Sequence, residues 1–139
     1  ETAALVPALP AGTPQEQYKY AYDLLRQMEY DEAERALKAF INANPDHNLT
    51  GNAYFWLAET YYVRGDYEEA MALFARGYQE FAGSAKAPAN LLKLAMSLAK
   101  LGRKEDACTT FQELGTRFPN ASSAIKQRAV TESRRAGCG

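Results

Sequence analysis

The sequence repeats itself with a period of 37 residues. Small residues keep this spacing in two registers, which are Ala21, Ala58 and Ala95 in one and Ala33, Ala70 and Ala107 in the other. Large apolar residues follow the same step at Leu37, Phe74 and Phe111. A fixed period of this length is typical of a solenoid, in which each unit buries its apolar face against its neighbours. The sequence therefore predicts an all-α scaffold of stacked helical hairpins.

Start and stop signals divide the chain into helices. Thr13 can cap a helix that begins at Pro14, with Glu16 completing a capping box, and Asp66 with Glu69 resembles a second box. Gly65 and Gly102 are placed to end helices in the left-handed conformation. The expected helices are 14–28, 31–44, 51–64, 67–82, 87–101 and 104–118, followed by a capping helix over 121–136. Met28 replaces the corresponding glycine in the first repeat, so we expect a less tight turn there.

The ends of the chain differ from its middle. Residues 1–12 contain two prolines and a glycine without any period, so we expect a disordered linker there. The repeat domain should extend over 13–136, and residues 137–139 should form a short tail.

Composition and charge argue against several function classes. A formal net charge of −1 provides no basic footprint for nucleic acid. No apolar run approaches the roughly 20 residues that cross a bilayer, so we expect no membrane insertion. The chain has one histidine, His47, and no glycine-rich phosphate loop, so we expect no metal, no cofactor and no enzymatic activity.

The pattern of small and large residues resembles the tetratricopeptide repeat. The second unit carries it as Tyr54, Leu57, Ala58, Tyr61, Ala70 and Phe74, and the third as Leu91, Leu94, Ala95, Leu98, Ala107, Phe111 and Pro119. The units fall at about 14–47, 51–84 and 88–121. The resemblance implies a tetratricopeptide-repeat superhelix of three helical hairpins plus a C-terminal capping helix.

Two longer stretches resemble a narrower family. NAYFWLAETYYVRGDYEEA (52–70) and KAPANLLKLAMSLAKLG (86–102) are similar to the C-terminal domain of the Tol–Pal-associated cell-division coordinator family. That resemblance implies a periplasmic, non-enzymatic adaptor that binds TolA. It also implies a link, through a penicillin-binding protein complex, between septal peptidoglycan synthesis and outer-membrane constriction in cell division.

The same resemblance carries an expectation about assembly. Family members trimerise through an N-terminal coiled coil that this sequence lacks, so we expect the present chain to be monomeric. The alternative is another cell-envelope scaffold of the same repeat type, such as an outer-membrane or a pilus or secretin assembly factor.

In the repeat fold, the first helix of each hairpin lines a concave groove, where a partner would bind. Aromatic and Met side chains suit such a surface because they give a large contact area at low entropic cost. The alternative is that some of these rings pack between hairpins. The predicted groove residues are Tyr18, Tyr22, Asn52, Phe55, Glu59, Tyr62, Leu92 and Met96.

The two cysteines, Cys108 and Cys138, allow two interpretations. A disulfide between them would pin the capping helix, and the oxidising periplasm that the family resemblance implies favours this pairing. The alternative is a buried Cys108 with a free thiol in the tail.

Overall fold

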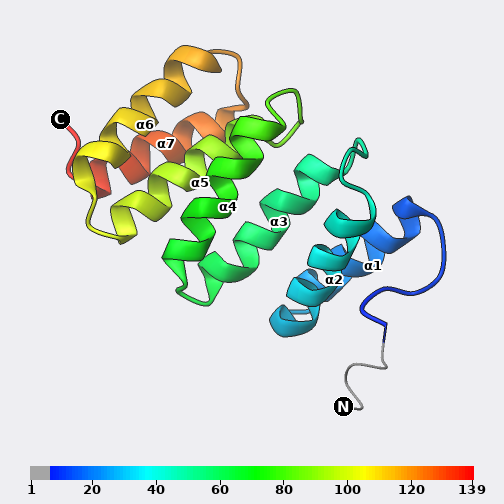
Figure 1. Cartoon of the computed structure of the whole chain (residues 1–139). Coiled ribbons are helices and arrows are strands. Elements are labelled where there is room, and N and C mark those ends of the chain that lie inside the picture. The colour runs from blue at the N-terminus through cyan, green and yellow to red at the C-terminus, as the bar shows by residue number, and fades with distance from the viewer. Residues whose placement is uncertain (1–6) are drawn as a thin grey trace.

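The computed structural model describes residues 7–139, and this part of the chain contains seven helices and no strand. Each helix lies within two residues of its predicted bounds, so the all-α repeat architecture is confirmed (Figure 1). None of the described helices is long and apolar enough to cross a membrane. The helices are α1 (Pro14–Arg26), α2 (Tyr30–Ala43), α3 (Thr50–Val63), α4 (Tyr67–Glu80), α5 (Ala87–Lys100), α6 (Lys104–Arg117) and α7 (Ser123–Arg135).

The helices form two layers, and neighbouring helices lie closer together in the layer of first helices than in the layer of second helices. Consecutive helices pair as hairpins, α1 with α2, α3 with α4 and α5 with α6, and each hairpin packs on the next. The first helices also contact one another, α1 with α3, α3 with α5 and α5 with α7, whereas the described second helices α2, α4 and α6 do not. Because the first helices lie closer together, they form the inner, concave side of the array.

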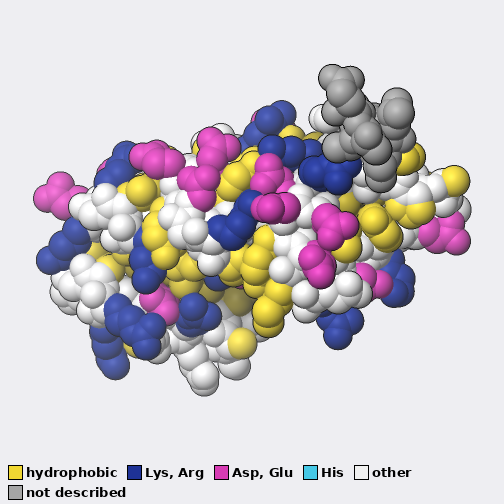
Figure 2. Space-filling model, turned by 90° about the horizontal axis from the view of Figure 1, so that it is seen from below, with side chains coloured by type: hydrophobic (Ala, Val, Ile, Leu, Met, Phe, Trp, Pro, Cys, Tyr) yellow, Lys and Arg dark blue, Asp and Glu magenta, His cyan; other side chains and the backbone are white. Residues whose placement is uncertain are grey.

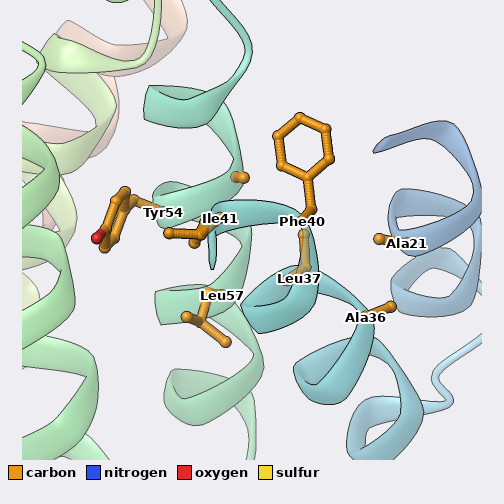
Figure 3. Close-up of a cluster of buried hydrophobic side chains, with 8 residues drawn as sticks. Ala21, Ala36, Leu37, Phe40, Ile41, Tyr54 and Leu57 are labelled. Carbon is orange, nitrogen blue, oxygen red and sulfur yellow. The ribbon is translucent and has the colours of Figure 1, made fainter. Parts of the chain in front are cut away.

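Buried alanines set the separation between helices. The six alanines of the two repeating registers are fully buried, as their spacing predicts. A methyl group at such a point lets two helix backbones approach closely. Larger side chains fill the space around them, and Figure 3 shows Leu37, Phe40 and Tyr54 in the cluster that α1, α2 and α3 share.

An ion-pair cluster joins α2 to α3 outside the apolar core. The Arg64 guanidinium contacts Asp31 at 2.8 Å and Glu34 at 2.7 Å, and the Tyr61 hydroxyl donates to Glu34 at 2.8 Å. Burial alone would raise the pKa of Glu34, but hydrogen bonds from Lys38, Arg64 and Tyr61 outweigh it and lower the pKa to about 2. Glu34 is therefore ionised at neutral pH and fixes the second helix of one repeat to the first helix of the next.

The two predicted capping boxes have different outcomes. Thr13 and Glu16 form a complete box at the start of α1. At α4, the Asp66 side chain makes no capping hydrogen bond, so that part of the prediction is wrong. The reason is the preceding turn, in which the Asp66 N–H donates to the Tyr61 carbonyl at 2.9 Å and holds the backbone outside the extended conformation that a capping residue adopts.

The turn at Met28 is as tight as the glycine turns. Met28 has a φ of 64°, beside 82° at Gly65 and 78° at Gly102. Its N–H donates to Leu25, and the next N–H donates to Leu24, which is the pattern of both glycine turns. The expectation of a looser first turn is therefore wrong. The hairpin geometry imposes a left-handed residue at this point, whichever side chain it carries.

We predict that Met28→Gly stabilises the domain. The Met28 side chain is 72% exposed, so its removal loses little packing, while the left-handed conformation costs a non-glycine residue about 1 kcal/mol. The free energy of unfolding from urea titration should rise by about 0.5 kcal/mol, because the greater freedom of glycine in the unfolded chain offsets part of the gain. Gly65→Ala is the reciprocal control and should destabilise. An unchanged or lower stability of Met28→Gly would contradict this account of the turn.

Residues 7–12 form no helix, but they lie against the domain. Leu9 packs on the first core cluster, and the Gln17 side-chain amide donates to the Pro10 carbonyl at 2.9 Å. Residues 1–6 of the expected linker lie outside the described residues.

Candidate protein-binding surface

The concave side carries a row of aromatic rings from the first two repeats. The Trp56 indole N–H donates to the Tyr18 hydroxyl at 2.9 Å, and the Tyr22 and Trp56 ring centroids lie 5.0 Å apart. Burial raises the pKa of Tyr18, although hydrogen bonds with Trp56 and Asn52 act against the shift. These contacts hold the rings in fixed positions while Tyr18, Tyr22 and Trp56 each keep part of their surface exposed.

Three of the predicted groove residues belong to the core instead. Phe55, Leu92 and Met96 are 6%, 5% and 3% exposed, so the prediction that they offer an open binding surface is wrong. Phe55 points toward α4, where its ring centroid lies 5.6 Å from that of Phe74. Leu92 and Met96 pack in the cluster of the third repeat. Met96 still reaches the wall of a hollow on this side, with little of its surface exposed.

The other five predicted residues, Tyr18, Tyr22, Asn52, Glu59 and Tyr62, are partly exposed. Whether they bind a partner stays a prediction.

Trp56 and Lys86 also lie on this surface, although the repeat positions did not predict them. The Lys86 ammonium lies 4.6 Å from the centre of the Trp56 ring and 5.0 Å from that of Phe55. Burial lowers the pKa of Lys86, and the nearby charge of Glu59 partly opposes this shift. The sequence held a signal that could have identified Trp56 as a surface residue. It is the only tryptophan in the chain and directly follows the predicted groove position Phe55.

A hollow of about 400 Å³ lies further along the concave side, between α3, α5 and α7. Glu59 and Lys93 form an ion pair there, with the ammonium 3.1 Å and 3.3 Å from the two carboxylate oxygens. The Lys93 ammonium also lies 4.4 Å from the centre of the Tyr62 ring. Burial raises the pKa of Tyr62 to about 12, so its hydroxyl keeps its proton at neutral pH. We refer to this feature as the α3–α5–α7 hollow.

The last helix is a wall of this hollow as well as a cap. Arg128, Glu132 and Arg135 of α7 line it. Arg128 and Arg135 both contact the Glu132 carboxylate, at 2.9 Å and 3.2 Å. The prediction of α7 as a cap over the third repeat did not include that Arg128 and Arg135 line this hollow.

A disulfide in the structure joins α7 to the rest of the domain. Cys108 of α6 bonds to Cys138, and Cys138 packs against the core cluster of the third repeat. No residue of α7 is fully buried, which means that apolar packing alone holds this helix weakly. The cross-link therefore contributes directly to keeping Arg128, Glu132 and Arg135 at the hollow.

We predict that the double variant Cys108→Ser/Cys138→Ser loosens α7 and leaves the three hairpins folded. Removing the cross-link should cost about 3–4 kcal/mol, the chain-entropy value for a loop of this length. Hydrogen exchange followed by mass spectrometry should show faster exchange over 123–136 and unchanged protection in α1 to α4. Equal protection of α7 in both proteins would contradict this role of the disulfide.

Comparison with protein families agrees with this architecture. Two family models described as tetratricopeptide repeat match the chain, one over residues 18–85 and the other over 89–121. The chain belongs to the tetratricopeptide-repeat family. The matched segments contain all three hairpins apart from the first residues of α1 and α5, so the repeat assignment from the sequence is confirmed.

The tetratricopeptide domain is also similar to curated relatives. Two proteins named cell division coordinator CpoB, both from Pseudomonas putida, are 39% identical to the chain over 49 residues. The match covers 35% of this chain and 18% of each relative. It confirms the predicted resemblance to the coordinator family at the level of this domain.

Proposed function

We propose that this tetratricopeptide domain is a non-enzymatic protein-interaction adaptor of the Tol–Pal system in the periplasm. Its partner is TolA. Through that contact, and through a penicillin-binding protein complex, it coordinates septal peptidoglycan synthesis with outer-membrane constriction during cell division. The observation that carries the adaptor role is the concave surface, where exposed rings and charged side chains line the first helices over a closed apolar core.

Three features of the domain support this function. The tetratricopeptide fold presents a preformed surface, so the domain loses little conformational entropy when a partner segment binds. Aromatic side chains such as Tyr22 and Trp56 are enriched among residues that dominate binding energy. The disulfide between Cys108 and Cys138 suits an oxidising compartment such as the periplasm.

The described residues contain no group of three or more His, Cys, Asp or Glu side chains that could hold a metal ion. The charged groups on the concave side are engaged in ion pairs and ring contacts, as Glu59 and Lys93 illustrate. This arrangement serves recognition of another protein.

We predict that the domain binds periplasmic segments of TolA from the same organism and that Tyr22→Ala weakens the binding. Tyr22 contacts Trp56 on the concave side, and loss of a central aromatic contact costs about 2 kcal/mol or more, which is a factor of about 30 in Kd. Isothermal titration calorimetry measures this change. Unaltered thermal unfolding of the variant would show that the loss is local.

Tyr20→Ala provides the matched control for this experiment. Tyr20 lies on the same helix, is 39% exposed and faces away from the row of Tyr18 and Tyr22. It should leave the affinity unchanged. Absence of heat at high micromolar concentrations of TolA would contradict the proposed partner.

A further inference from the structure

We propose that the α3–α5–α7 hollow binds a carboxylate of the partner segment, an Asp or Glu side chain that follows an apolar residue by about three positions. This inference rests on the proposed function, because it specifies the chemistry that the adaptor surface recognises.

The charge of the hollow differs from that of the whole chain. Lys93, Lys100, Arg128 and Arg135 line it, together with two carboxylates, those of Glu59 and Glu132. Four positive charges against two negative ones leave an excess of two, whereas the chain carries a net charge of −1. A concave site with an excess of one sign of charge favours a ligand of the opposite sign. Figure 2 views the molecule from below relative to Figure 1. On that face, hydrophobic side chains gather near the middle, with charged side chains of both signs around them.

The internal ion pairs orient the cations without using all of their donors. Arg128 contacts Glu132 through Nε, and Arg135 contacts the same oxygen through Nη1. A guanidinium has five N–H donors, so both arginines keep donors for a second acceptor. Glu132 draws both arginines toward the hollow, where their remaining donors can make charge-assisted hydrogen bonds to an incoming carboxylate.

Lys100 supplies a charge that no carboxylate in the described ion pairs neutralises. Its ammonium lies 5.9 Å from the centre of the Tyr67 ring at the edge of the hollow, and the side chain is exposed. The protonated Tyr62 hydroxyl adds a further donor. The hollow is therefore rich in donors and suits a ligand that only accepts, which is the character of an ionised carboxylate.

The spacing of residues along α3 suggests how far an apolar residue of the partner segment lies from its acidic residue. Trp56, in the aromatic row, and Tyr62, in the hollow, are six residues apart on α3, which is a rise of about 9 Å along the helix axis together with a turn of about 120° around it. An extended peptide covers that rise in about three residues, which is the least separation that the two sites require. A segment that runs along α3 thus places an apolar side chain on Tyr22 and Trp56 and an acidic one among Lys93, Lys100 and Arg128.

Two fluorescent peptides test the proposal directly. One carries Phe followed by Asp three positions later in a Gly/Ser background, and the other has Asn in place of Asp. We expect fluorescence anisotropy to show saturable binding of the Asp peptide, weakening as salt concentration rises. The Asn peptide should bind at least about tenfold more weakly, in line with loss of one charge-assisted contact. Equal binding of the two peptides would overturn the proposal.

Charge reversal locates the site. Lys100→Glu should weaken the Asp peptide at least about tenfold, whereas Lys126→Glu makes the same substitution on the outer surface of α7 and should change the affinity little. An equal loss of affinity in the two variants would show that only the net charge of the domain matters, and would overturn the proposed site. Displacement of the Asp peptide by inorganic phosphate at equal concentration would also overturn it, by revealing a general anion site.

The same variants separate this inference from the proposed function. TolA binding that Tyr22→Ala weakens and Lys100→Glu leaves unchanged would keep the adaptor and overturn the carboxylate site. Binding of the Asp peptide that depends on Lys100, without any binding of TolA, would keep the site and overturn the partner.

Discussion

Close contact between helices at buried alanines is the constraint on which the rest of the structure depends. Ala21, Ala58 and Ala95 have no exposed surface, and neither do their counterparts on the second helices. A larger side chain at any of these points would push two backbones apart, at a cost of about 1–3 kcal/mol. Because the same contact recurs every 37 residues, each hairpin meets the next at a similar angle, and a curved array with one concave side follows.

The candidate binding surface is a consequence of that curvature. Where the first helices approach each other, side chains such as Phe55 and Leu92 are buried, and neighbours such as Trp56 and Lys93 remain partly exposed. The surface therefore combines rings that adjacent repeats hold in place, such as Trp56 on Tyr18, with ion pairs that cross between helices, such as Glu59 with Lys93. The last helix completes it, and the disulfide fixes that helix in position.

The repeat period predicted the helices and the buried alanines because both depend on local spacing and side-chain volume. It did not separate Phe55 from Trp56, since burial at adjacent positions depends on how closely the next hairpin approaches. Met28 shows a similar limit: the hairpin turn imposes its left-handed backbone against the preference of the side chain. The placement of Arg128 in the hollow depends on the orientation of α7, which follows a connection one residue shorter than the connections between successive hairpins.

We propose that the domain binds its partner on the concave side, from Tyr22 to Arg128. The most direct test is a titration of the isotope-labelled domain with the TolA segment, followed by amide chemical shifts in two-dimensional NMR spectra. The account predicts that the largest shifts fall on α1, α3, α5 and α7, at residues around Trp56 and Lys93. Shifts concentrated on the outer helices α2, α4 and α6 would contradict it.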